Sequence, residues 1–208
     1  MNNQTVIILV RHGQTEWNRV ERFRGCADVP LNEAGLAQAE AVAQRMAAEW
    51  QLAAVHSSPL SRAVQTGEAI ARPFGLPVIP CPGLIDIDYG QWQGLTPEEA
   101  RARWPETVQA WYSTPHLERI PGGETLAELR VRGMAAVRSL AVQHAGQTVA
   151  LVGHTVINRI ILLAVLGLGD DRFWHLRQDN CAINVFEAEA GDFTLVSMND
   201  VCHLRRES

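Results

Sequence analysis

Two histidines and two arginines in this sequence each come shortly after an apolar run of the kind that forms a buried strand. They are Arg11, His12, Arg62 and His154. A neutral imidazole is a nucleophile near pH 7, and guanidinium groups bind tetrahedral oxyanions through paired hydrogen bonds. If the strand ends bring these side chains together, they form a pocket that binds a phosphoryl group and accepts it on a histidine.

The strands and helices that must position these side chains can be predicted from the periodicity of the apolar residues. The predicted strands cover residues 6–10, 53–56, 76–79, 148–152, 185–186 and 193–198. The predicted helices cover residues 33–50 with Asn32 as N-cap, a stretch with Pro59 in its first turn that includes Arg62, then 125–144 and 156–166. This alternation indicates an α/β fold with a largely parallel sheet, in which ligands bind beyond the carboxyl ends of the strands.

The composition narrows the class of protein. The chain has 208 residues, of which 47% are hydrophobic, and a net charge of −5. Charges of both signs are scattered along it, so we expect neither a nucleic-acid partner nor a membrane surface, both of which require a basic stripe. All 18 basic residues are arginines, which excludes a lysine-dependent phosphate-binding loop and a pyridoxal Schiff base.

The cysteines and histidines predict no cofactor. Cys26, Cys81, Cys181 and Cys202 are far apart, which argues against a disulfide framework or a zinc knuckle. None of the seven histidines has zinc-ligand spacing, so we expect no metal. No signal-peptide pattern precedes the first strand, and the longest apolar stretch, 160–168, is too short to span a bilayer. We therefore expect a cytoplasmic protein.

Several short blocks of the sequence form an ordered set of motifs. They are Leu9–Asn18, Arg22–Gly25, Asp28–Gly35, Ser57–Thr66, Tyr89–Gly94, Pro121–Thr125 and Val152–His154. In their residues and their order these blocks resemble the histidine phosphatase superfamily, and more narrowly its phosphoglycerate mutase-like branch. The whole set is far more specific than the Arg-His-Gly tripeptide alone. The resemblance implies a three-layer sandwich, with a mostly parallel central sheet flanked by helices.

The resemblance also implies a role for each matching position. His12 would be the nucleophile that becomes phosphohistidine. Arg11 and Arg62 would hold the phosphoryl oxygens, and His154 would complete the pocket. The substrate-binding positions would be Thr15, Asn18, Arg24, Gly25, Glu124 and Thr155. Two of these have structural alternatives, because Asn18 could cap a turn and Glu124 could lie in the first turn of the helix from Thr125.

The general acid is where this chain departs from the pattern that it resembles. Similar chains commonly carry Glu in a Leu-x-Glu-x-x-aromatic-Gly frame, whereas this frame has Asp86 at the acid position. Because Asp86 is one methylene shorter, its loop must come closer or a water must bridge. The flanking Ile85 and Ile87 predict an apolar setting that keeps the carboxyl group protonated for donation. Asp88 is a rival acid, although a solvated loop position explains it equally simply.

We expect a single domain over residues 1–208, with residues 81–123 inserted as an acid loop and lid. This segment has weak periodicity, several Pro and Gly residues, and Trp92, Trp104 and Trp111. Such irregular segments are typical of binding loops that lie over a site rather than of core elements. The tryptophans could contact apolar parts of a substrate, or they could pack within the lid.

Together these features predict a metal-independent phosphatase that acts on a small phosphomonoester through a phosphohistidine on His12. The mutases of the branch carry an extra segment with an Arg-Arg pair and lysines, and the corresponding region here is short and has neither. A phosphoglycerate mutase and a non-catalytic module that binds a phosphorylated ligand are the alternatives. The expected partner is a small phosphorylated metabolite, and an exposed edge strand would allow a homodimer.

Overall fold

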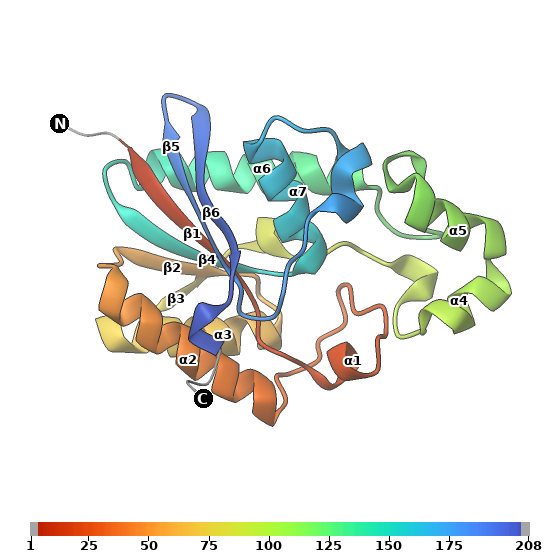
Figure 1. The fold of residues 1–208 in the computed structure, drawn as a ribbon, viewed down its shortest axis with the longest axis horizontal. Helices are drawn as coiled ribbons and strands as arrows, with labels where there is room; N and C mark the ends of the chain where they lie inside the picture. Colours follow the sequence, from red (N-terminus) through yellow and green to blue (C-terminus); the bar gives the residue numbers. More distant parts are fainter. Residues whose placement is uncertain (1–3, 205–208) are drawn as a thin grey trace.

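A six-stranded sheet with helices on both faces forms the centre of the computed structural model, which describes residues 4–204 (Figure 1). The strands are β1 (Thr5–Arg11), β2 (Ala54–Ser57), β3 (Val78–Pro80), β4 (Thr148–Gly153), β5 (Ile183–Glu189) and β6 (Asp192–Asp200). Their order is β3-β2-β4-β1-β5-β6. The first four strands pair in parallel, and β5 and β6 pair antiparallel. The mostly parallel sheet is therefore confirmed, whereas the ends of the predicted domain, 1–3 and 205–208, lie outside the described residues.

Two pairs of helices cover the two faces of the sheet. One face carries α2 (Glu33–Glu49) and α3 (Ser61–Ala71), and the other carries α6 (Leu126–Gln143) and α7 (Thr155–Val165). Because successive side chains of a strand point to opposite faces, β1 contributes to both cores. Ile8 and Val10 pack with α2 and α3, while Ile7 and Leu9 pack with α6 and α7. These three layers confirm the predicted sandwich.

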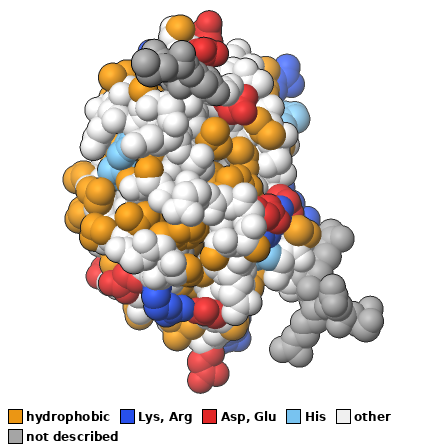
Figure 2. Space-filling view, turned by 90° about the vertical axis from the view of Figure 1, so that its left-hand side faces the viewer, with side chains coloured by type: hydrophobic (Ala, Val, Ile, Leu, Met, Phe, Trp, Pro, Cys, Tyr) orange, Lys and Arg blue, Asp and Glu red, His pale blue; other side chains and the backbone are white. Residues whose placement is uncertain are grey.

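The remaining elements are short and mostly lie between β3 and α6. The other α-helices are α1 (Glu16–Arg19), α4 (Pro97–Arg103) and α5 (Pro105–Ser113). The 3₁₀ turns are Arg72–Phe74, Pro82–Leu84, Gly90–Trp92, Pro115–Leu117, Asp170–His175 and Cys202–Leu204. Within the described part of the chain, no helix is both long and apolar enough to cross a membrane. On the face at the left of Figure 1, hydrophobic side chains are interspersed with scattered charges of both signs (Figure 2).

Of the two helix starts predicted from Asn32 and Pro59, the first is confirmed and the second is wrong. The Asn32 side chain accepts a hydrogen bond from the Gly35 amide and caps α2, as predicted. The prediction that Pro59 lies in the first turn of α3 is wrong. The N-cap of α3 is Leu60, so Pro59 precedes the helix. An extended conformation at Leu60 delays the start of α3 by two residues from the proline.

Residues 81–123, which we expected to lie over a site rather than to form core elements, also contribute to the core. Trp92 and Trp111 are 0% and 1% exposed, and both belong to the same buried cluster as α6 and α7. Trp111 packs against Phe173, with 5.6 Å between their ring centroids. Each tryptophan buries a large apolar area, so this segment contributes to the core even though its periodicity is weak. Its Trp104 is only partly buried against the same cluster.

The strand registers bring three loops together at one edge of the sheet. Arg11 at the end of β1 pairs with Gly153 at the end of β4, and Ser57 at the end of β2 pairs with Val152. The next residues continue this pattern, because the His12 amide donates to the Gly153 carbonyl at 3.0 Å. The residues that follow β1, β2 and β4 therefore emerge side by side at the carboxyl edge.

The loop that follows His12 packs backbone to backbone against the first turn of α2. A Cβ atom on Gly35 would lie 2.0 Å from the Gln14 carbonyl oxygen, which no side-chain rotation can relieve. We expect Gly35→Ala to lower the free energy of unfolding by about 1–3 kcal/mol through overpacking, as measured by urea denaturation. The control Leu36→Ala, at a position 51% exposed in the same turn, should change it by less than about 0.5 kcal/mol. Equal stability of the two variants would contradict this account of the loop.

Candidate active site

A cavity of about 420 Å³ opens at the carboxyl edge of the sheet. The predicted site residues that line it are Arg11, Asn18, Arg24 and Thr155. Much of the remaining wall is aromatic and consists of Phe23, Tyr89, Trp111, Tyr112, Phe173 and Trp174. The other predicted catalytic residues, His12, Arg62, Asp86 and His154, are buried at 0–3% exposure and are not part of the cavity wall. Among the predicted catalytic residues, the strand ends therefore bring Arg11 to the wall of the cavity.

The two predicted histidines lie together, with ring centroids 5.0 Å apart and an angle of 59° between the ring planes. Nδ1 of His12 is 2.6 Å from the carbonyl oxygen of Gly13. A carbonyl oxygen only accepts hydrogen bonds, so Nδ1 must carry the proton. In the neutral ring, Nε2 of His12 therefore keeps its lone pair, which is the form that a nucleophile requires.

Arg62 orients the second histidine. Its Nε donates to Nδ1 of His154 at 3.1 Å, and its two terminal nitrogens donate to the carbonyl oxygens of Gly25 and Ala27 at 2.7 and 2.6 Å. Because a guanidinium group only donates, Nδ1 of His154 accepts and the proton of the neutral ring lies on Nε2. That nitrogen is 2.8 Å from the Ser58 hydroxyl, which accepts from it.

The site is cationic and dry. Burial, together with the charge of Arg62, lowers the pKa of both His12 and His154 well below the usual value. Burial also lowers the pKa of Arg11 to about 9 and that of Arg62 to about 10. Among the described residues, Nε of Arg11 is buried without a hydrogen-bond partner. Buried positive groups of this kind are stabilised by an anion that enters the site.

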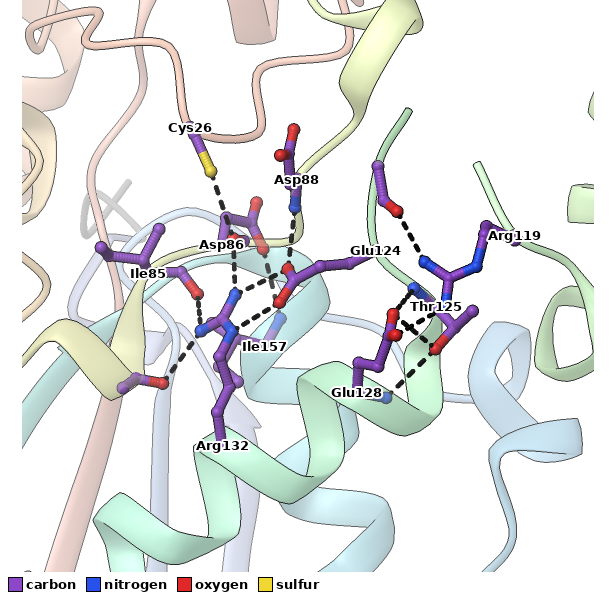
Figure 3. Close-up of polar contacts among 12 residues, drawn as sticks. Cys26, Ile85, Asp86, Asp88, Arg119, Glu124, Thr125, Glu128, Arg132 and Ile157 are labelled. Carbon is purple, nitrogen blue, oxygen red and sulfur yellow. Dashed lines mark hydrogen bonds and ion pairs between the residues drawn. The ribbon is translucent and has the colours of Figure 1, made fainter. Parts of the chain in front are cut away.

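Asp86 is buried, at 3% exposure, but its setting differs from the prediction (Figure 3). Its Oδ1 accepts hydrogen bonds from the amides of Val156 and Ile157, both at 3.2 Å, in the first turn of α7. The positive end of a helix stabilises a negative carboxylate. The expected apolar setting of this carboxyl group is therefore wrong. The flanking isoleucines describe only the local chain, whereas α7 is 70 residues away.

An arginine on α6 holds the loop of Asp86 through its backbone (Figure 3). Arg132 donates to the carbonyl oxygens of Ile85 and Asp86 at 2.6 and 2.8 Å. It also pairs with Glu124, with a distance of 2.9 Å between Nε and Oε1. Glu124 in turn accepts from the Asp88 amide at 2.9 Å. Glu124 thus braces the loop, and because it precedes the N-cap Thr125 it does not lie in the first turn of α6.

The rival carboxylate has a local partner of its own. Oδ1 of Asp88 accepts from the Gly90 amide at 2.8 Å, two residues along the chain. This is a turn contact of the kind that Asp makes with its own backbone. Asp88 is partly exposed, whereas Asp86 is buried and held by α7. The geometry therefore favours Asp86 over Asp88.

Three of the predicted substrate-binding residues have structural roles in the loops: Thr15 and Asn18 cap a helix, and Gly25 forms a turn. Thr15 and Asn18 form the capping box of α1, in which Oδ1 of Asn18 accepts from the Thr15 amide at 2.9 Å. Asn18 also lines the cavity, so both of its predicted roles are compatible with its position, whereas Thr15 is fully buried. The positive φ of 47° at Gly25 turns its carbonyl oxygen toward Arg62.

The other two predicted substrate-binding residues, Arg24 and Thr155, lie on the cavity wall. Nη1 of Arg24 donates to the carbonyl oxygens of Trp17 and Arg22, both at 3.2 Å. Among the described residues, Oγ1 of Thr155 is buried without a partner. That hydroxyl is therefore free to contact a bound ligand.

Sequence reasoning missed several residues of the site. Gln178 accepts from Nη1 of Arg11 at 2.6 Å through its carbonyl oxygen, and the Asn180 side chain donates to the carbonyl oxygen of His12 at 3.1 Å. Both lie in a loop before β5 that carries no local signal. Arg159 lines the cavity one helical turn after Thr155. The spacing of four residues, which places two side chains on the same helix face, could have identified it.

The comparisons with known proteins agree with this geometry. Residues 7–201 match the histidine phosphatase superfamily (branch 1). Phosphoserine phosphatase 1 of Hydrogenobacter thermophilus is 37% identical over 198 residues, 95% of this chain and 93% of the relative. Metal-independent phosphoserine phosphatase of Arabidopsis thaliana is 36% identical, over 96% of this chain and 83% of the relative. Another Arabidopsis relative, 35% identical over 95% of this chain and 86% of its own, is named phosphoglycerate mutase-like protein 4.

A solved structure extends the likeness to the whole fold. YhfR of Bacillus stearothermophilus superposes with a TM-score of 0.92 at 30% sequence identity. The match covers 97% of this chain and 100% of that protein. The family match, the relatives and the fold all lead to the same conclusion. The chain belongs to the histidine phosphatase superfamily and is a phosphatase of its phosphoglycerate mutase-like branch.

Proposed function

We propose that this phosphatase hydrolyses a small phosphomonoester through a covalent phosphohistidine on His12, with Asp86 as general acid and base. The observation that carries the proposal is the contact between Nδ1 of His12 and the Gly13 carbonyl oxygen, because it leaves Nε2 as the nucleophile. In this proposal the chain is a single domain, in which residues 81–123 supply the acid loop and part of the aromatic wall.

The first step transfers the phosphoryl group to the enzyme. Nε2 of His12 attacks phosphorus, the P–O bond to the leaving group breaks, and the leaving oxygen takes a proton from Asp86. Arg11 and Arg62 stabilise the charge on the equatorial oxygens, and His154 orients the Arg62 guanidinium by accepting from its Nε.

The second step releases the phosphoryl group to water. Asp86, now ionised, takes a proton from a water molecule as that water attacks phosphorus. The bond between Nε2 of His12 and phosphorus breaks, and inorganic phosphate leaves. His12 is neutral again, and Asp86 carries the proton for the next cycle.

The substrate that we propose first is a phosphorylated hydroxy amino acid such as phosphoserine. Two relatives with more than a third of their residues identical to this chain are named phosphoserine phosphatases. The cavity volume of about 420 Å³ suits a small metabolite. Its arginines suit a substrate that carries more negative charge than the phosphoryl group alone.

We expect His12→Ala to reduce phosphoserine turnover by at least about 10³-fold, because no other nucleophile replaces the imidazole. Acid quenching with ³²P-labelled substrate should trap a phosphoenzyme in the wild type and none in the variant. His116→Ala, at an exposed position, is the matched control and should keep both signals. Label retained by His12→Ala would overturn the assignment. Primer-dependent isomerisation of 3-phosphoglycerate without phosphate release would instead identify a mutase.

The acid role of Asp86 predicts a dependence on the leaving group. Serine leaves as an alkoxide that needs a proton, whereas p-nitrophenolate leaves without one. Asp86→Asn should therefore slow phosphoryl transfer from phosphoserine by about 10²–10⁴-fold and from p-nitrophenyl phosphate by less than about 10-fold. Rapid-quench measurement of the first turnover separates this step from the attack of water. Equal losses for both substrates would argue against proton donation, and Asp88→Asn should slow neither.

The lowered pKa of His12 predicts the acid side of the pH profile. A base whose pKa is lowered stays neutral to lower pH, so His12 keeps its lone pair as the pH falls through its usual value of 6.5. We therefore expect kcat/KM for p-nitrophenyl phosphate, corrected for ionisation of the substrate, to hold its value below pH 6.5 and to fall only at a lower pH. A midpoint at or above 6.5 would contradict the buried, cationic setting of His12.

A further inference from the structure

Arg159 is distinguished among the arginines that line the cavity by its lack of a hydrogen-bond partner. Arg11, Arg22 and Arg24 each donate to a backbone carbonyl oxygen. Arg159 has no hydrogen bond or ion pair to any residue within 4–204, and its Nε is fully buried. A buried donor on a charged group costs free energy unless something satisfies it. The N–H groups of Arg159 are thus available to a ligand in the cavity.

Aromatic rings hold the Arg159 guanidinium in place. Its Cζ lies 5.1 Å from the ring centroid of Phe173 and 5.2 Å from that of Trp174. Trp174 is itself fixed, because its Nε1 donates to the Trp111 carbonyl oxygen at 2.8 Å and its ring stacks on Tyr112. Such cation–π contacts orient the guanidinium plane but satisfy none of its N–H groups. The N–H groups of the guanidinium are therefore oriented before an acceptor binds.

The charge around Arg159 is not balanced by a carboxylate in contact with it. Glu21 is the only acidic residue in the lining of the cavity, against four arginines. Asp86 is close enough for its charge to act on Arg159, but its Oδ1 already accepts two amides of α7. Burial lowers the pKa of Arg159, as expected for a cation that lacks a close anion. An anionic group on the ligand would complete this part of the site.

Arg159 lies against the aromatic part of the cavity wall, where its guanidinium contacts Phe173 and Trp174. It comes from α7, whereas Arg11 and Arg62, the arginines proposed to hold the phosphoryl group, come from β1 and α3. The anion that Arg159 can bind is therefore a second group of the substrate, separate from the phosphoryl group held beside His12.

We propose, on the basis of the phosphatase function above, that Arg159 binds a carboxylate of the substrate and selects phosphorylated hydroxy acids over neutral or cationic phosphomonoesters. Guanidinium and carboxylate groups pair through two parallel hydrogen bonds. The aromatic rings that hold Arg159 fix the plane of its guanidinium for this pair. Arg159 is thus a specificity residue that contacts the substrate and takes no part in proton or phosphoryl transfer.

The test compares O-phosphoserine with O-phosphoethanolamine, which lacks only the carboxylate. We expect Arg159→Met to reduce kcat/KM for phosphoserine by roughly 10- to 100-fold, the range of a charge-assisted hydrogen bond. The same variant should change kcat/KM for phosphoethanolamine by less than about threefold. Arg159→Lys keeps the charge but loses the paired N–H groups of the guanidinium. Its kcat/KM should lie between those of the wild type and Arg159→Met for phosphoserine alone. Arg22→Met, whose guanidinium is already held by Gly94 and Glu99, should leave the ratio of the two substrates unchanged.

A binding measurement separates this inference from the catalytic proposal. Calorimetry in the His12→Ala background gives the dissociation constants of both phosphomonoesters without turnover. Adding Arg159→Met should raise the dissociation constant of phosphoserine roughly 10- to 100-fold. It should change that of phosphoethanolamine by less than about threefold. Equal effects on the two ligands, or none on either, would overturn the role of Arg159. Failure of the phosphohistidine mechanism would appear separately, as a wild-type enzyme that binds both ligands and forms no phosphoenzyme.

Discussion

The contacts of the buried Arg62 guanidinium are the constraint on which the rest of this site depends. This side chain is fully buried, and its partners are a ring nitrogen of His154 and the carbonyl oxygens of Gly25 and Ala27. None of them is an anion. One charge thereby ties together the start of α3, the loop after α1 and the residue that opens α7. Because the hydrogen bonds of this guanidinium all go to neutral groups, its charge is available to attract a phosphoryl group in the mechanism that we propose.

Within residues 4–204, two arginines that line the cavity also have no carboxylate in contact with them. Arg11 and Arg159 each have a buried Nε without a partner among the described residues, and burial lowers the pKa of both side chains. Buried guanidinium groups without a carboxylate partner lower the stability of the fold relative to a site in which each cation is paired. The phosphatase is therefore less stable without a ligand than it would be with paired cations. A ligand with two negative groups restores that stability when it binds.

Sequence patterns predicted what short-range rules control. The apolar runs predicted β1 and β4, and the polar residues after them predicted that His12 and His154 would meet. The patterns failed where a contact depends on how helices and loops pack against one another rather than on the register of the strands. The contact of Asp86 with the first turn of α7 and the hold of Arg132 on the Asp86 loop depend on how helices pack. Neither the isoleucines beside Asp86 nor the helical periodicity around Arg132 contains that information.

The aspartate at the acid position is explained by how its loop is held. Arg132 grips the backbone carbonyl oxygens of Ile85 and Asp86, so the position of the loop does not depend on the length of the acidic side chain. The α7 amides then engage Oδ1 of Asp86 at 3.2 Å, which fixes the direction of the carboxylate. Since Oδ1 accepts these two hydrogen bonds, Oδ2 is the oxygen that would donate to the leaving group in the mechanism that we propose. A shorter acid suits this site because the backbone, and not an extra methylene, sets its reach.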